Sequence, residues 1–326
     1  MPEAFALLAG GLVVLVVGAE GVVRGASRIA ERLGVSRLFI GLTVVALGTS
    51  SPEVVVSVEA ALRGLPSLAV GNVVGSNIFN IGVVLGLTAI ISPIPVHGVI
   101  VQREVPIVIA LTAVLFAIAH GGGIIRAESG LLLLGLVAYL AWAYRTARAA
   151  HFALPGEPSL ADTLSLTLPG KGPPRPGALR WAKNLTYLLG GLAFLVIGSR
   201  YVIDGAEEIA RIADISDTMV GLTVVAVGTS LPELATSVVA AFRKEPEMAV
   251  GNVLGSNIFN ILMILGIAGV VQPLEVSPRI VRIDIPVALG FALACFPILM
   301  SSRRISRTEG ITLLILYGAY MAFLVR

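Results

Sequence analysis

Long apolar stretches separated by short polar segments run through almost the whole chain. Their ranges are roughly 4–20, 38–62, 66–92, 104–120 and 125–145, then 183–201, 218–242, 246–272, 284–301 and 308–325. A helix needs about 20 predominantly apolar residues to cross a bilayer. These stretches are apolar all round, without the alternation that membrane β-barrel strands require. The pattern predicts an all-α integral membrane protein with ten transmembrane helices.

Composition supports this class. Hydrophobic residues make up 56% of the chain and charged residues only 13%, against about 25% charged residues in soluble proteins. The formal charge of +3 fits a Lys/Arg excess in cytoplasmic loops, so we expect a lipid bilayer and no nucleic acid among the partners. The single cysteine, Cys295, excludes an intramolecular disulfide. The first stretch lacks the basic start of a signal peptide, because Glu3 precedes it.

The two sets of five stretches are copies of one unit. Gly41–Glu53 reads GLTVVALGTSSPE, and Gly221–Glu233 reads GLTVVAVGTSLPE, 180 residues further on. The same offset aligns AVGNVVGSNIFN at Ala69–Asn80 with AVGNVLGSNIFN at Ala249–Asn260 without a gap. A fixed offset over such long runs indicates an internal duplication.

The duplication predicts three domains. Residues 1–145 form the first five-helix repeat and residues 182–326 the second. Residues 146–181 between them include six prolines and several glycines. Such a segment neither packs into a core nor crosses a bilayer, so we predict a linker.

Five spans in each copy is an odd number, so two fused copies must insert with opposite orientations. With the N-terminus outside, 16 of the 23 Lys and Arg residues fall on the cytoplasmic side and seven outside, the bias that cytoplasmic loops carry. We therefore expect both termini outside the cell membrane and the linker in the cytoplasm. Inverted repeats are typical of secondary transporters, whose substrate site lies near the midplane where the repeats meet.

Two acidic residues, Glu53 and Glu233, lie inside the second and seventh spans at equivalent positions. A charge near the bilayer centre costs at least about 2.5–3.5 kcal/mol, and no Lys, Arg or His lies nearby in sequence to pair with either one. We interpret the pair as ligands of a shared cation. Two protonated glutamates, hydrogen-bonded to neighbouring helices, are the alternative.

Each of these glutamates follows a proline, Pro52 or Pro232. Because proline lacks an N–H and clashes with the preceding turn, helices 2 and 7 should be broken here. The carbonyls of Gly48 and Gly228 then lose their helical donors. Exposed backbone oxygen at membrane depth is tolerated only where it is buried or lines a cavity, so each break should bring carboxylate, carbonyl and hydroxyl oxygens together.

The third and eighth spans add further oxygen donors in their GSNIFN runs. Serine and asparagine four residues apart share one helical face, so we expect these side chains to line the site: Ser76, Asn80, Ser256 and Asn260. By the same helical phase, Asn77 and Asn257 are expected to point elsewhere. The GxxxG glycines are expected to let helices approach closely: Gly71, Gly75, Gly251 and Gly255.

The ligand set contains only oxygen, which favours hard cations over soft metals. Ca²⁺ takes about 6–8 oxygens in flexible geometry, whereas Mg²⁺ keeps most of its waters, so the set suits Ca²⁺ and Na⁺, and Mn²⁺ stays open. Two ionised glutamates supply a charge of −2, which one Ca²⁺ or two Na⁺ would balance. Mutually exclusive binding, with a barrier to moving the empty site, would enforce exchange. No resident cofactor is expected.

The paired motifs GTSSPE with GNVVGSNIFN, and GTSLPE with GNVLGSNIFN, resemble the alpha repeats of Na⁺/Ca²⁺ exchangers in the cation/Ca²⁺ exchanger superfamily. The chain resembles a prokaryotic member over essentially its whole length. The resemblance implies ten transmembrane helices with an ion-binding core formed by the second, third, seventh and eighth. The long first and sixth helices would slide across this core to alternate access.

The resemblance also implies roles for single residues. Ca²⁺ would be held by Glu53, Glu233 and the backbone oxygens of Thr49 and Thr229. The flanking Na⁺ sites would be completed by four serine hydroxyls and two carbonyls: Ser50, Ser76, Ser230, Ser256, Ala46 and Ala226. Asn80 and Asn260 would take the middle position.

Two features bear on the counter-ion. Some archaeal members of the family carry Asp where this chain has Asn260, which leaves one fewer titratable group here. Proton-coupled members typically carry a GNA-type sequence where this chain has GTS. Both favour Na⁺, with a proton-coupled or K⁺-dependent exchanger of the same fold as the alternative.

Two other classes are less consistent with the chain. An intramembrane hydrolase using Ser50 or Ser51 would need a base, and the three histidines, His97, His120 and His151, lie in loops or at span ends. We therefore expect no enzyme activity. A passive channel stays open as an interpretation, although inverted repeats favour alternating access. We expect the protein to function as a monomer.

Overall fold

The computed structural model describes residues 2–95, 100–153, 178–212, 226–301 and 304–324, which are almost entirely helical. Within these residues, seven helices are long and apolar enough to cross a membrane, or eight when the bent pair Arg37–Thr49 and Ser51–Leu62 counts as one span. The other two predicted spans are 218–242, whose described part forms α12 and α13, and 308–325, which corresponds to α17. The all-α multi-span fold is confirmed, and the count of ten stays a prediction.

The two repeats carry the same succession of elements. The first contains α1 (Pro2–Leu33), α2 (Arg37–Ile40), η1 (Gly41–Val45), α3 (Ala46–Thr49), α4 (Ser51–Leu62), α5 (Pro66–Phe79), η2 (Asn80–Leu85), α6 (Gly86–Ile91), β1 (Ile94–Pro95), η3 (Ile100–Glu104), α7 (Val105–His120), β2 (Gly123–Ile124) and α8 (Arg126–Ala153). The second contains α10 (Ala178–Ile212), α12 (Ala226–Thr229), α13 (Leu231–Phe242), α14 (Pro246–Phe259), η5 (Asn260–Ile264), α15 (Leu265–Val271), β3 (Leu274–Glu275), η6 (Ile280–Asp284), α16 (Ile285–Ser301), β4 (Arg304–Ile305) and α17 (Arg307–Leu324). The η segments are π-helical turns, a widening of the helix that is frequent at functional sites.

The described helices extend into both ends of the predicted linker, because α8 continues to Ala153 and α10 begins at Ala178. The rest of the predicted linker, 154–177, lies outside the described residues.

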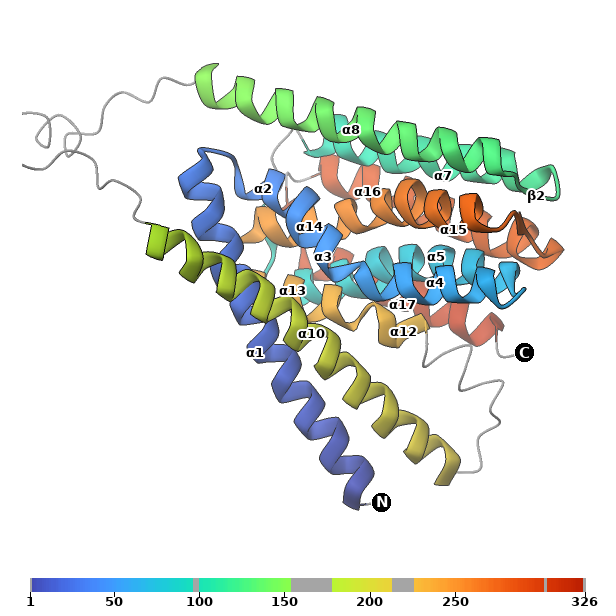
Figure 1. The fold of residues 1–326 in the computed structure, drawn as a ribbon, viewed down its shortest axis with the longest axis horizontal. Helices are drawn as coiled ribbons and strands as arrows, with labels where there is room; N and C mark the ends of the chain where they lie inside the picture. The colour runs from blue at the N-terminus through green and yellow to red at the C-terminus, as the bar shows by residue number, and fades with distance from the viewer. Residues whose placement is uncertain (1, 96–99, 154–177, 213–225, 302–303, 325–326) are drawn as a thin grey trace, which may run out of the picture.

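The centre of the molecule is formed by two continuous rods, Pro66–Ile91 and Pro246–Val271 (Figure 1). In their most apolar windows 78% and 89% of the residues are buried inside the protein, against at most 39% in the other spans. A span that is buried by protein rather than lipid can carry polar side chains at low cost, since protein groups can pair with them. The two rods are therefore the place where the polar GSNIFN runs can lie.

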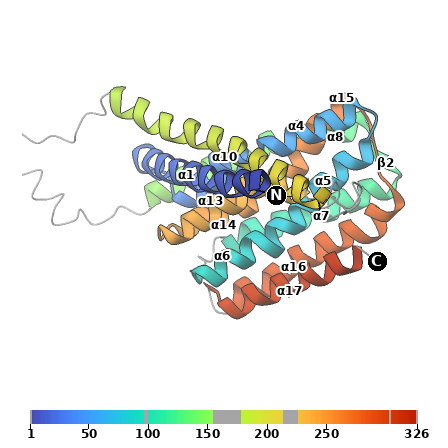
Figure 2. The ribbon, with the colours of Figure 1, turned by 90° about the horizontal axis from the view of Figure 1, so that it is seen from below.

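The first helices of the two repeats, α1 and α10, lie side by side in both views (Figures 1 and 2). Gly11 meets Gly198 and Gly18 meets Gly191, so residue numbers rise along one helix as they fall along the other. The pair is antiparallel, which confirms the inverted orientation. At Gly191 an added Cβ would come within 2.6 Å of the Gly18 carbonyl oxygen, so glycine is what permits this close approach.

Strands and helices of one repeat pair with those of the other. Strand β1 pairs antiparallel with β4, and β2 pairs with β3, so each two-stranded sheet takes one strand from each repeat. Helix α8 packs on α15 of the second repeat, and its counterpart α17 packs on α6 of the first. The repeats therefore interlock rather than fold as independent units.

Helix α1 is also tied to α13 by an ion pair. Arg243, the residue after α13, bonds the carboxylate of Glu20 on α1. The counterparts at the 180-residue offset, Arg63 and Arg200, carry like charges, and Arg63 pairs instead with Glu59 of its own helix. Within the described residues this tie exists on one side of the pseudo-symmetric pair only.

The glycine contact between α1 and α10 gives a test of the fold. Gly191→Ala should lower the melting temperature by several degrees, because its Cβ would press on backbone atoms of α1 and force the helices apart, an overpacking cost of roughly 1–3 kcal/mol. Gly190→Ala is the matched control, since a Cβ there meets nothing within 4 Å. Equal melting temperatures for the two purified variants would contradict the close α1–α10 contact.

Candidate functional site

Both predicted helix breaks are present. Ser50 ends α3 and begins α4 with φ −79° and ψ 7°, and Ser230 does the same between α12 and α13 with φ −90° and ψ 6°. In the first repeat the two arms differ in direction by 45°. Pro52 and Pro232 follow directly as early residues of the second arm, where a missing N–H is harmless. The proline therefore ends one helix and starts the next.

The broken helices place each glutamate against the other repeat. Ser50 Oγ donates to Glu233 Oε1 at 2.9 Å, and Ser230 Oγ donates to Glu53 Oε1 at 3.1 Å. Both glutamates are 1% exposed, and within the described residues neither takes part in an ion pair with Lys, Arg or His. Two buried acids thus share one centre, each held by the break of the opposite repeat.

Serines from the central rods join the same centre. Ser256 Oγ donates to Glu233 Oε1 at 3.4 Å, and Ser230 Oγ lies 3.1 Å from Ser76 Oγ. Both rod serines are fully buried. Three of the four predicted serine hydroxyls therefore bond a carboxylate directly and Ser76 bonds one through Ser230; these serines and the two glutamates are called the carboxylate cluster.

Four buried asparagines of the two central rods are hydrogen-bonded in a chain across the repeats, which is called the asparagine chain. Asn80 Nδ2 donates to Asn257 Oδ1 at 3.0 Å, and Asn260 Nδ2 donates to Asn77 Oδ1 at 2.9 Å. The prediction that Asn77 and Asn257 point elsewhere is wrong. The prediction followed the one face that serine and asparagine share, whereas each rod contacts the other rod as well as the carboxylates, so side chains from two sides of a rod are used.

Two further asparagines, which were not singled out in the sequence, hold the threonines of the breaks. Thr49 Oγ1 donates to Asn252 Oδ1 at 3.1 Å, and Thr229 Oγ1 to Asn72 Oδ1 at 3.4 Å. Each asparagine also donates to a serine on the preceding helix of its own repeat: Asn252 to Ser237 and Asn72 to Ser57, both at 3.0 Å. The signal was available, because Asn72 with Asn252 and Ser57 with Ser237 obey the 180-residue offset.

The two alanines lie at the first residue of α3 and of α12. The Ala46 carbonyl accepts the Ser50 N–H at 3.0 Å and the Thr49 hydroxyl at 3.3 Å. In the second repeat the Ser230 N–H bonds the Val227 carbonyl at 3.2 Å. The breaks are therefore alike in position but differ in backbone hydrogen bonding.

Four buried oxygens at this centre have no hydrogen-bond partner: Glu53 Oε2, Glu233 Oε2, Asn80 Oδ1 and Asn260 Oδ1. They form two pairs related by the 180-residue offset. A buried acceptor without a donor costs roughly 1–3 kcal/mol, so four together are unfavourable unless a cation satisfies them. No group of three or more His, Cys, Asp or Glu side chains exists within the described residues. The oxygen set therefore fits a hard cation.

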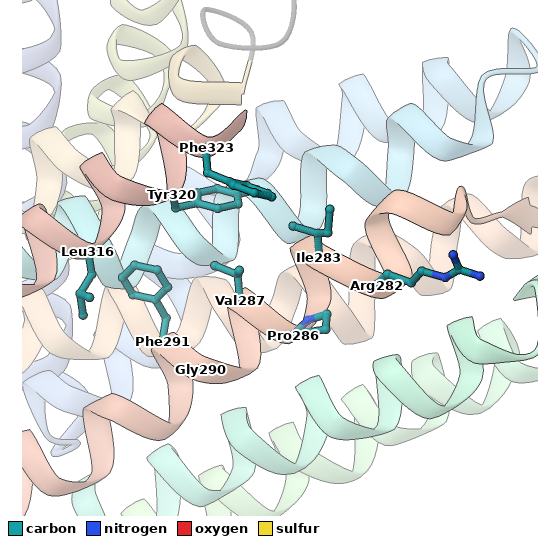
Figure 3. Close-up of a pocket in the computed structure, with 9 residues that line it drawn as sticks. All are labelled: Arg282, Ile283, Pro286, Val287, Gly290, Phe291, Leu316, Tyr320 and Phe323. Atoms are coloured by element: carbon teal, nitrogen blue, oxygen red, sulfur yellow. The ribbon is translucent and has the colours of Figure 1, made fainter. Parts of the chain in front are cut away.

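A separate apolar cavity of about 630 Å³ lies between α16 and α17 (Figure 3). It is lined by side chains such as Val287, Phe291 and Leu316, and Arg282 points away from it at one end. None of the residues that line it belongs to the carboxylate cluster, so this cavity is distinct from the polar centre.

Comparison with known proteins identifies the family. The family described as "Sodium/calcium exchanger protein" matches residues 3–145 and 183–326. The chain belongs to the sodium/calcium exchanger protein family. The "Putative antiporter CaxA" of Alkalimonas amylolytica is 39% identical over 319 residues, which cover 96% of each chain. The "Sodium/calcium exchanger MaX1" of Methanosarcina acetivorans is 34% identical over 343 residues, 98% of each chain.

A solved structure of this exchanger family has the same fold. A structure of the sodium-calcium exchanger NCX_Mj, soaked with Na⁺ and Ca²⁺, superimposes with a TM-score of 0.81 at 33% identity. The match covers 98% of this chain and 97% of the other. The resemblance read from the repeated motifs is thus confirmed, as is the assignment to a transporter family.

The asparagine chain gives a prediction for this exchanger. Asn257→Ala should weaken Ca²⁺ binding about tenfold, because Asn80 would lose the acceptor that orients its amide, a loss of about 1.4 kcal/mol. Equilibrium ⁴⁵Ca²⁺ binding to the purified protein measures this. Asn184→Ala removes a buried asparagine on α10 outside this chain of asparagines and serves as the control. The role given to these asparagines is wrong if both variants bind like the unmodified protein.

Proposed function

We propose that this protein is a secondary active antiporter that exchanges Ca²⁺ for Na⁺ by alternating access at one shared site. The observation that carries the proposal is the buried pair Glu53 and Glu233, each bonded by the opposite repeat and unpaired with any cationic residue that the structure describes. Buried charges require compensation. Here the compensating charge is the transported ion.

The ligand assignment is the one that the family resemblance implies, and the carboxylate cluster supports it. Ca²⁺ is held by the two carboxylates with the backbone oxygens of Thr49 and Thr229, next to the unpartnered oxygens of Asn80 and Asn260. The flanking Na⁺ sites are completed by hydroxyl and carbonyl oxygens: Ser50, Ser76, Ser230, Ser256, Ala46 and Ala226. All of these residues are at most 3% exposed, apart from Ala226, whose side chain is not described.

Charge balance gives the coupling. The two carboxylates supply −2, which one Ca²⁺ or two Na⁺ neutralise. Because both ions use the same oxygens, they compete for one site, and moving the uncompensated pair through a low-dielectric centre is costly. The protein therefore changes its accessible side only when it is loaded, which is the condition for obligatory exchange.

The relatives support these ions. MaX1 is named a sodium/calcium exchanger, the NCX_Mj structures concern extracellular ion exchange in a sodium-calcium exchanger, and CaxA is named a putative antiporter. Relatives named sodium/potassium/calcium exchangers match only 42% of this chain, at 32% identity. The relatives that match nearly the whole chain thus include proteins named for Na⁺ and Ca²⁺, whereas those also named for K⁺ match less than half of it.

The proposal includes the arrangement in the membrane. The protein has ten spans in two repeats, 1–145 and 182–326, joined by a cytoplasmic linker, with both termini outside and with no enzyme activity. It works as a monomer in the cell membrane. The Lys/Arg bias supports this orientation, and labelling of a cysteine placed in the linker from one side of sealed cells tests it.

The counter-ion is tested in proteoliposomes loaded with Na⁺. An outward Na⁺ gradient should drive Ca²⁺ uptake without K⁺, because the site holds both ions in turn. A pH gradient alone should drive none, since the middle of the site carries the amides of Asn80 and Asn260 rather than a carboxylate. Uptake driven only by the pH gradient, or only when K⁺ is present, would show a proton-coupled or K⁺-dependent exchanger instead.

The carboxylates are tested by neutralisation. Glu53→Gln or Glu233→Gln should lower Na⁺-driven Ca²⁺ flux at least 100-fold while the protein still inserts and purifies, because the site loses half of its negative charge. Glu59→Gln is the control, since this exposed residue lies on the same helix as Glu53 and pairs with Arg63. Normal flux in either site variant would refute the assigned role.

A further inference from the structure

At each of the two helix breaks a serine hydroxyl bonds a glycine carbonyl, but the serines come from different helices. Proline at 52 and 232 leaves the carbonyls of Gly48 and Gly228, four residues earlier, without their helical N–H donors. Gly48 O accepts the hydroxyl of Ser51 at 2.7 Å, from the next helix of the same break. Gly228 O accepts the hydroxyl of Ser199 at 2.7 Å, from α10.

In the sequence, neither of these two serines has a serine at the equivalent position of the other repeat. At the 180-residue offset Ser51 corresponds to Leu231, and Ser199 corresponds to Ala19. Each repeat therefore carries one serine that bonds its glycine carbonyl, but only in the second repeat does this serine come from outside the broken span. The two copies of the break, GTSSPE and GTSLPE, differ only at Ser51 and Leu231, so the source of the serine is the point at which they diverge.

Helix α10 lies against both breaks. A Cβ added at Gly48 would meet Leu192 of α10 at 2.5 Å, and one added at Gly228 would meet Ile203 of α10 at 2.4 Å. Ser199 lies between these contacts and is 3% exposed. In Figure 1 α10 crosses next to α12 and α13, in agreement with its contacts.

We propose that Ser199 is a positioning residue that links α10 to the second half of the ion site by holding the Gly228 carbonyl. Gly228 is joined directly to Thr229, whose carbonyl is an assigned Ca²⁺ ligand, and lies two residues before Ser230, which bonds Glu53. Fixing the Gly228 peptide limits the rotation of the next one. This inference rests on the proposed function, because it concerns the same Ca²⁺ site.

The consequence is an asymmetry between the halves of the site. The first break is stabilised within itself and keeps its shape wherever α10 lies. The second keeps its shape only while Ser199 is in register with Gly228. A displacement of α10 along its axis would release the Gly228 carbonyl and loosen the second half of the site.

The test is equilibrium ⁴⁵Ca²⁺ binding to purified full-length protein in nanodiscs, which does not depend on the counter-ion. Ser199→Ala should raise the Kd for Ca²⁺ about tenfold. Ser199→Ala combined with Leu231→Ser should return it to within about twofold, because Ser at 231 can cap Gly228 as Ser51 caps Gly48. Ser199→Thr, which keeps the hydroxyl, should also bind normally.

Thr112→Ala is the control, because Thr112 is equally buried but bonds only a carbonyl of its own helix, Val108 O at 2.8 Å. It should leave the Kd unchanged even where it lowers the melting temperature as much as Ser199→Ala does. An unchanged Kd in Ser199→Ala overturns the proposal. So does a raised Kd that neither Leu231→Ser nor Ser199→Thr restores. Absence of Ca²⁺ binding by the unmodified protein would instead refute the proposed function.

Discussion

The structure depends on two carboxylates buried at its centre without a cationic side chain among the described residues to neutralise them. An ionised group in a low-dielectric interior is costly, and the protein places Glu53 and Glu233 at equivalent points of two interlocked repeats. The serines of the breaks bond them across the repeat boundary. Neither repeat can form this centre alone, because each carboxylate is bonded by a serine of the other repeat.

The rest of the core serves this arrangement. Breaking a helix inside a membrane frees backbone groups that lipid cannot satisfy, and here serine hydroxyls take the glycine carbonyls that the prolines leave without donors. The threonine hydroxyls are in turn held by asparagines of the opposite repeat. Many polar side chains of the core are thus held by another, while one oxygen of each carboxylate and of Asn80 and Asn260 stays without a hydrogen-bond partner.

Much of the site could be predicted from the sequence, because the internal duplication repeats the same residues 180 positions apart. Glu53 and Glu233 stand out as charges in apolar spans, and Pro52 and Pro232 fix the breaks. Asn77 and Asn257 were misplaced, since a helical wheel describes one helix and cannot tell that a second rod faces its other side. Asn72 and Asn252 were missed although the duplication marks them. The length of α1, to Leu33, exceeds the predicted span because its later turns carry arginines yet stay helical.

The strand pairs β1 with β4 and β2 with β3 bear on how a duplicated chain of this kind can be assembled. Each sheet closes only when a strand from one repeat meets a strand from its oppositely inserted twin. Two separate copies of one five-helix unit, inserted in opposite senses as an antiparallel homodimer, would supply the strands for both pairings. A single fused chain in addition lets the two copies differ in sequence, so that serines such as Ser51 and Ser199 lie on different helices.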